Sequence, residues 1–282
     1  MINRYKNLQL IQQLDPEKDH WQICYLILGY EFPWDSLRAL EVALMRTYCI
    51  PSISKLLNKT GEFIHRPQKR YDDTSIMLTE IIKWGYESER GQEALQKMNS
   101  IHRRFQIDNT DFLYVLSTFI YEPIRWNQRF GWRLMCENEK LATFYFWRQI
   151  GQLMDIENIP DTYQEFERYN LDYEKANFRY SDDNRKIGES TRDLFISWFP
   201  KWLEKPLKPL TYTLLDATML DAFGFEHPAP FLCRTVEKIL KIRGRILQFF
   251  PAPNQSDFFI DHPTRTYPHG YEIAKLGPDI KS

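Results

Sequence analysis

Apolar residues recur at intervals of three and four along most of the chain, and few stretches alternate apolar and polar residues with a period of two. Because the three-and-four spacing is that of one helix face, the pattern predicts an all-α fold. The 11 glycines are few for this length, and most of the 16 prolines fall between periodic stretches. We expect a single multi-helix domain of about ten helices over residues 1–250 and an extended C-terminal arm over residues 251–282.

Caps and prolines set the expected helix boundaries. Helices are predicted over 21–29, from Asp35 or Ser36 to 45, 52–58, 74–86, from Gly91 to 105, 110–121, 124–135, 140–154, from Pro160 to 173, 191–203, 209–222 and 228–249. Asp72 or Asp73 is the expected N-cap of the helix that begins at Thr74. Pro123 is expected to interrupt the helical run around it, and residues 180–185 to form a flexible connector.

One histidine falls on the apolar stripe of a predicted helix. Leu95, Met98, His102 and Phe105 are three or four residues apart, so a helix places them on one face. The imidazole of His102 is therefore expected to point into the interior, where each ring nitrogen needs a partner. A backbone carbonyl, a carboxylate or a metal could be that partner, and spacing alone favours a hydrogen-bonded core histidine.

A second candidate group lies one helix earlier. Arg70 and Thr74 are four residues apart, so they share a face if this turn is helical. An arginine and a hydroxyl on one buried face can orient a bound oxygen species or a carboxylate. The structural alternative is an N-terminal capping arrangement in which Asp73 accepts hydrogen bonds from the first backbone amides.

Charge and cysteine content narrow the function classes. The chain has 37 Lys and Arg against 38 Asp and Glu, so its balance gives no support for nucleic acid as a partner. The composition, 43% hydrophobic and 15% aromatic, can fill a large core. Four cysteines are scattered without CxxC spacing, which predicts free thiols in a reducing compartment and neither a zinc site nor a disulfide framework.

No membrane-crossing segment is predicted. The start of the sequence, residues 1–20, lacks the pattern of a signal peptide, and no run approaches about 18 consecutive apolar residues. We therefore expect a soluble protein, cytoplasmic or peripherally associated with a membrane. The aromatic-rich segment 195–203 could lie at a membrane interface, although an amphipathic core helix is the favoured interpretation.

The common catalytic motifs are absent from the sequence: it has no GxGxxG, P-loop, GxSxG, HExxH or EF-hand pattern. A non-heme iron site would need a second histidine near His102, and nothing in the sequence brings His20, His65 or His227 there. A heme needs a single protein ligand, an apolar cavity and cations for its propionates. Candidate cations near His102 are Arg103, Arg104 and Arg70.

Several short motifs occur in a characteristic order. They are Arg70-x-x-x-Thr74, a helix ending in Ile101-His102, Ile159-Pro160-Asp161-Thr162 followed by Phe166-x-x-Tyr169, and the tail His262-Pro263-x-Arg265-x-Tyr267-Pro268-x-Gly270-Tyr271 with Leu276-Gly277-Pro278. Together they resemble the helical oxygenase family shared by latex-clearing rubber oxygenases and the fungal MpaB enzymes. The resemblance covers residues 35 to 278, and the tail is similar to the MpaB branch.

The resemblance implies a heme b cofactor with His102 as the proximal iron ligand, and Arg70 and Thr74 as polar residues near the distal heme face. Rubber oxygenases carry a lysine just before that threonine. This chain has Asp73 there, which argues against a lysine-capped resting state. The upstream glutamate of those enzymes has no match, because the spacing of Glu62 differs.

The implied activity is heme-dependent oxidation or cleavage of an alkene in a lipophilic, isoprenoid-like substrate with O₂. Two alternatives stay open. One is a non-catalytic helical scaffold or binding protein, in which His102 would hydrogen-bond to the protein. The other is a peroxidase-like heme enzyme that uses the same site.

Overall fold

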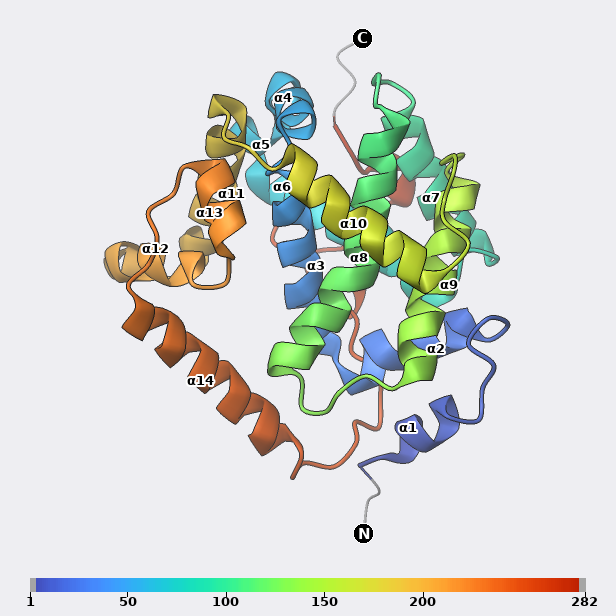
Figure 1. Cartoon of the computed structure of the whole chain (residues 1–282). Coiled ribbons are helices and arrows are strands. Elements are labelled where there is room, and N and C mark those ends of the chain that lie inside the picture. The colour runs from blue at the N-terminus through green and yellow to red at the C-terminus, as the bar shows by residue number, and fades with distance from the viewer. Residues whose placement is uncertain (1–3, 279–282) are drawn as a thin grey trace.

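The computed structural model describes residues 4–278, which form α-helices, short 3₁₀ and π turns and loops, without a β-strand (Figure 1). The predicted all-α fold is thus confirmed for these residues. The fourteen α-helices are α1 (Lys6–Ile11), α2 (His20–Leu26), α3 (Pro33–Thr47), α4 (Pro51–Thr60), α5 (Glu62–His65), α6 (Pro67–Trp84), α7 (Glu89–His102), α8 (Asn109–Phe130), α9 (Glu137–Leu153), α10 (Tyr163–Asn177), α11 (Asp182–Ser197), α12 (Glu204–Tyr212), α13 (Ala217–Phe223) and α14 (Pro230–Leu247). A π turn, Ile27–Glu31, continues α2.

The largest apolar core lies around α8, the longest helix. Its buried residues Leu113, Leu116, Ile120 and Ile124 are three or four positions apart and pack among side chains of α2, α6, α7 and α9. A second core joins the end of α3 to α11 and α13. Figure 1 shows α3 and α8 side by side, with α10 crossing them.

Two helices begin at a proline, several residues before the acidic residues that were predicted to cap them. α6 begins at Pro67, so Asp72 and Asp73 lie inside this helix and are not its caps. α3 likewise begins at Pro33, ahead of Asp35 and Ser36. Proline at the first helical position lacks only an amide that would be unpaired anyway, and its φ suits the helix. The cap predictions were wrong because this proline signal outweighs an acidic residue further along.

Pro123 does not interrupt the helical run. α8 continues through it from Asn109 to Phe130, and the flanking Ile124 and Trp126 are buried. A proline inside a helix removes one backbone hydrogen bond and disfavours the preceding turn. Burial of the apolar face on both sides of Pro123 outweighs that cost, so the predicted break is corrected to one long helix.

Two other predictions fail at helix ends. Residues 180–185 are not a flexible connector: the Ser181 hydroxyl accepts from the Asn184 amide at 3.1 Å and caps α11. The Asn184 side chain is fully buried and donates to the nearby Arg179 carbonyl and to the Cys49 and Ala222 carbonyls, which lie in distant parts of the chain. The single helix expected over 209–222 is divided into α12 and α13, because Asp216 caps α13 by accepting from the Met219 amide.

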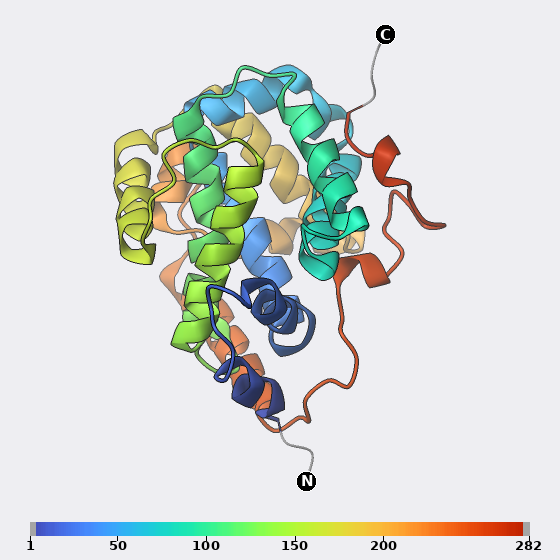
Figure 2. The ribbon, with the colours of Figure 1, turned by 90° about the vertical axis from the view of Figure 1, so that its right-hand side faces the viewer.

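From residue 251 the chain is irregular apart from two 3₁₀ turns, Phe259–Asp261 and Ile273–Lys275, and it runs along the outside of the helices (Figure 2). Residues 251–278 are called the arm below. The side chains of α6 hold it, as the Thr266 amide donates to Asp72 at 2.8 Å and the Tyr271 hydroxyl donates to Glu80. The structure does not describe residues 1–3 and 279–282. The first three belong to the segment 1–20 in which no signal peptide is expected, and the last four to the end of the predicted arm; both parts of these predictions lie outside the described residues.

Within residues 4–278, no helix combines the length and apolar character needed to cross a bilayer. The four cysteines are free, as predicted, with Cys24 and Cys49 buried and Cys136 and Cys233 partly exposed.

Candidate functional site

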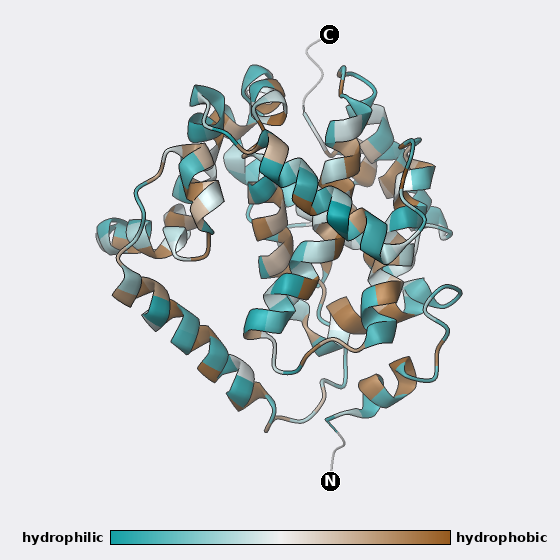
Figure 3. Cartoon of the chain, in the orientation of Figure 1, coloured by the Kyte–Doolittle hydropathy of each residue, from teal (hydrophilic) through white to brown (hydrophobic). Residues whose placement is uncertain are grey.

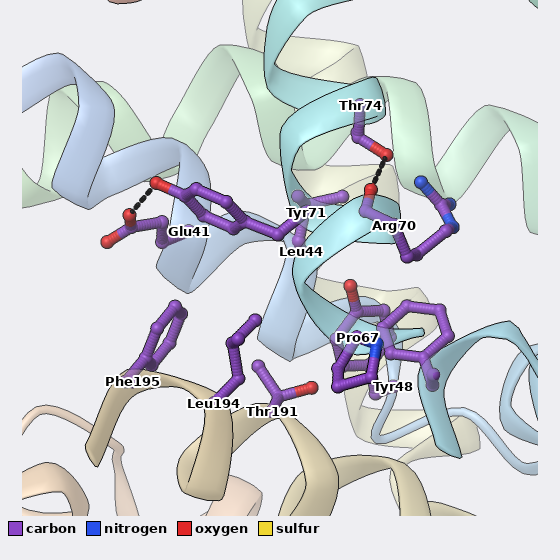
Figure 4. A pocket seen from close by; sticks show the side chains of 11 residues that line it. Glu41, Leu44, Tyr48, Pro67, Arg70, Tyr71, Thr74, Thr191, Leu194 and Phe195 are labelled. Carbon is purple, nitrogen blue, oxygen red and sulfur yellow. Dashed lines mark hydrogen bonds between the residues drawn. The ribbon is translucent and has the colours of Figure 1, made fainter. Parts of the chain in front are cut away.

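A hollow opens between α3, α6 and α11, with about 410 Å³ of empty space that includes its opening to solvent (Figure 4). Its walls are mainly apolar and aromatic; they include Leu44, Tyr48, Phe63, Pro67, Leu194 and Phe195. Polar atoms enter it chiefly from α6, which contributes Arg70, Tyr71 and Thr74, and from α3, which contributes Glu41. An apolar wall with a few converging polar groups is typical of a small-molecule site.

Arg70 and Thr74 lie on one face of α6, as their spacing predicted, and both border the hollow. The Thr74 hydroxyl donates to the Arg70 carbonyl at 2.9 Å, which leaves the lone pairs of its oxygen available as acceptors. The Arg70 guanidinium lies 5.3 Å from the centre of the Phe63 ring, within cation–π range. In Figure 4 the side chains of Arg70 and Tyr71 leave α6 in opposite directions.

His102 is the last residue of α7, and its ring meets the edge of Phe112 with centroids 5.3 Å apart. Its Nδ1 is buried and has no hydrogen-bond partner within the described part of the chain. Burial, reinforced by the positive charge of Arg70, lowers the pKa of His102 to about 4. At neutral pH the imidazole is therefore uncharged and keeps an unengaged nitrogen, which suits coordination of a metal.

This arrangement corrects the expected environment of His102 in two respects. Leu95 and Met98 are buried as predicted, but α7 ends at His102, so Phe105 does not continue the stripe and the histidine stays partly exposed. The expected partner for each buried ring nitrogen is also missing at Nδ1. Burying a polar atom without a partner is costly, so it marks a place where a ligand can compensate.

Of the three arginines expected near a cofactor, Arg70 is the one whose charge lowers the pKa of His102. Arg103 is exposed and pairs with the exposed Asp155 at 3.3 Å. Arg104 is also exposed. Arg70 thus borders the hollow, and its positive charge also acts on His102 of α7.

Asp73 does not face the hollow. Its buried carboxylate accepts from Lys69 Nζ at 2.7 Å, from the Tyr267 hydroxyl at 2.5 Å and from the Gly277 amide at 2.9 Å. Two of these donors belong to the arm. The interpretation of Asp73 as a cap is therefore wrong, and the residue is a fastening point for the arm.

Glu41 and Tyr71 were missed by the sequence analysis. The Tyr71 hydroxyl donates to the Glu41 carboxylate at 2.6 Å, beside the hollow, and Arg38 donates to the same carboxylate at 2.7 Å (Figure 4). Burial raises the pKa of Glu41, and burial together with Glu41 raises the pKa of Tyr71. The pair joins α3 to α6 across 30 positions, and no local motif signals such a contact.

The other histidines do not gather around His102. His20 is bonded through both ring nitrogens, to the Glu17 carbonyl at 2.5 Å and to the Tyr86 hydroxyl at 2.6 Å. His227 pairs with Asp221 at 2.8 Å. No cluster of three or more His, Cys, Asp or Glu side chains that could hold a metal ion is found in residues 4–278.

Comparison with known proteins adds a family match. The family described as the catalytic domain of ER-bound oxygenase mpaB/B' and rubber oxygenase matches residues 37–238. The ER-bound oxygenase mpaB' of Penicillium brevicompactum is 28% identical over 242 residues, covering 79% of this chain and 57% of the relative. The ER-bound oxygenase mpaB of the same fungus is 31% identical over 242 residues, covering 79% and 55%.

The chain thus spans little more than half the length of these curated relatives. Among solved structures, latex clearing protein in its closed state aligns with a TM-score of 0.48 and 12% identity, over 88% of this chain and 73% of that protein.

Proposed function

The chain belongs to the family of ER-bound oxygenases mpaB and mpaB' and rubber oxygenase, and from this premise we propose that it is a heme b-dependent oxygenase. The proposed reaction is the oxidation or cleavage of an alkene in a lipophilic, isoprenoid-like substrate with O₂. In this proposal His102 would be the iron ligand, and Arg70 and Thr74 would be polar residues near the cofactor. The protein would work in the cytoplasm or in peripheral contact with a membrane.

The observation that carries the proposal is the unengaged imidazole nitrogen of His102. A metal ligand must be neutral and have a free lone pair, and the lowered pKa of about 4 together with the unpartnered Nδ1 fits this requirement. In the scaffold alternative this nitrogen should instead carry a hydrogen bond from the protein. Heme needs just one protein ligand, the role proposed for His102.

The residues around the hollow would divide the remaining tasks. A bound heme would supply the chemistry of O₂ activation, and His102 would hold its iron. The apolar walls exclude water and suit a lipophilic substrate. Arg70 offers positive charge and Thr74 a hydroxyl oxygen, while Glu41 offers a carboxyl group held in place by the Tyr71 hydroxyl.

The first test is the absorption spectrum of the purified full chain after reconstitution with hemin. Wild-type protein is expected to show a Soret band, and His102→Ala to lose or markedly shift it. His227→Ala is the matched control, since this exposed histidine pairs with Asp221 on a surface loop. A wild-type protein that stays colourless with hemin contradicts the proposal.

A second test separates oxygenase from peroxidase chemistry. Reconstituted protein is incubated with a polyisoprenoid under O₂ without peroxide, and carbonyl products are sought by mass spectrometry. Products that require peroxide would favour the peroxidase-like alternative.

A further inference from the structure

One side of α14 carries large apolar side chains that stay exposed to solvent. Phe231, Ile239, Ile242 and Ile246 are 65%, 59%, 43% and 51% exposed, and Phe249 and Phe250 directly after the helix are 88% and 57% exposed. These six residues are called the α14 stripe. The spacing of the four residues within α14 places them on one face of the helix, and the two phenylalanines extend that side beyond its end. Figure 3 shows brown bands repeating along α14, and Figure 1 shows this helix at the edge of the molecule.

The orientation of α14 is fixed by its opposite face. Gly244 is buried so closely that a Cβ there would lie 2.7 Å from the Phe130 carbonyl oxygen. Arg243 donates to Asp35 at 2.9 Å, and its guanidinium lies 3.8 Å from the centre of the Trp34 ring. The helix is therefore held on the body of the protein along one side, and the α14 stripe points away from it.

Positive charge borders the α14 stripe. Four exposed basic residues, Arg234, Lys238, Lys241 and Arg245, follow one another at helical spacing on the adjacent face. Over its length α14 contains five basic residues and one acidic residue, Glu237, whereas the whole chain is nearly neutral with a net charge of −1. Glu237 pairs with Lys241 at 2.6 Å. The local excess of cations is thus concentrated beside the exposed apolar side chains.

We propose that α14 docks in the plane of an anionic membrane surface. The α14 stripe would enter the boundary between headgroups and acyl chains, and the neighbouring basic row would contact lipid phosphates. A helix that buries one side on the protein and exposes a second apolar side gains free energy when that second side leaves water. The flanking cations make an anionic bilayer the complementary partner. The proposal does not rest on heme or on the proposed reaction.

The test is vesicle flotation of the full chain. Vesicles of phosphatidylcholine alone are compared with vesicles that also contain phosphatidylserine, at low and high salt. Wild-type protein is expected to float with the anionic vesicles and to be partly released by salt. Ile242→Ser with Ile246→Ser, and separately Lys238→Glu with Arg245→Glu, should each lower the partition coefficient about tenfold or more.

Leu171→Ser with Lys175→Glu on α10 is the matched control, since it also changes one exposed apolar and one exposed basic residue. This control should bind as wild type does. Thermal unfolding of every variant verifies that it is folded. Absence of flotation by folded wild-type protein overturns the proposal, as does equal loss in the control. A stripe variant that turns a wild-type dimer into a monomer without affecting flotation would assign the surface to a second copy of the chain.

Discussion

The Tyr267 hydroxyl donates a 2.5 Å hydrogen bond to the Asp73 carboxylate and so ties the arm to the middle of α6, across 194 positions of the chain. The same carboxylate accepts from the Gly277 amide and from Lys69, and Lys69 also donates to the Gly277 carbonyl at 2.7 Å. All three donors are satisfied by one buried acid. At the position where the resemblance sets a lysine in rubber oxygenases, this chain therefore has an anchor for its C-terminal segment.

Asp73→Ala should loosen the arm. It leaves the Gly277 amide and the Tyr267 hydroxyl without their acceptor and Lys69 with the Gly277 carbonyl as its remaining one, so we expect a loss of about 2–4 kcal/mol in the free energy of unfolding. Limited proteolysis should cut the arm faster than in wild type. Exposed Asp172→Ala on α10 serves as control and should change neither measurement. Wild-type stability and cleavage in Asp73→Ala would show that the arm is held by other contacts.

Gly277→Ala and Gly270→Ala form a matched pair of substitutions in the arm. Both glycines have positive φ, +92° and +104°, which an alanine adopts at similar cost. A Cβ at Gly277 would lie 2.5 Å from Ile101 Cδ1, whereas a Cβ at Gly270 meets nothing within 4 Å. Since Ile101 must leave its preferred rotamer, we expect Gly277→Ala to cost about 1 kcal/mol more, measured by urea unfolding. Equal losses in the free energy of unfolding would mean that the Ile101 side chain moves aside without a measurable penalty.

The sequence predicts those parts of the fold that local rules decide. Helical periodicity gives the all-α class, and α4 ends at Gly61, whose φ of +70° is the left-handed conformation that a glycine after a helix commonly takes. Pro123 shows the limit of such rules, because the packing of α8 overrides a strong local signal. Asp73 shows another limit, since its partners come from the arm and cannot be inferred from its neighbours in sequence.

The candidate site likewise contains some residues that the sequence predicts and others that depend on how the helices pack. The shared face of Arg70 and Thr74 follows from their spacing on one helix, and the structure brings both to the hollow. The pairing of Glu41 with Tyr71 depends on how α3 meets α6, so no single helix reveals it. The helix that carries His102 was predictable, but the end of that helix at His102, which leaves its ring partly exposed, was not.

His102→Leu should separate cofactor binding from stability. The substitution removes a buried nitrogen that lacks a partner, so the protein without heme is expected to be as stable as wild type or about 1 kcal/mol more stable in urea. Hemin reconstitution should nevertheless fail. His20→Leu is the control with the opposite expectation: both of its ring nitrogens are bonded, so it should cost about 1–2 kcal/mol. Marked destabilisation by His102→Leu would indicate a structural role for this ring.

Glu41→Gln should change how stability depends on pH. Burial raises the pKa of Glu41, so the folded state binds this proton more tightly than the unfolded chain does, and ionisation at higher pH disfavours the fold. Below the ordinary glutamate pKa of about 4.5 the acid is protonated in both states and resembles glutamine. The stability of Glu41→Gln relative to wild type should therefore rise as pH increases from about 4 to 7, as urea unfolding at each pH can measure. Glu237→Gln should change in the opposite direction, because the bond from Lys241 lowers the pKa of Glu237 and its contribution is lost as pH falls. A Glu41→Gln difference that stays constant with pH would mean that the Glu41 carboxyl titrates normally beside Tyr71.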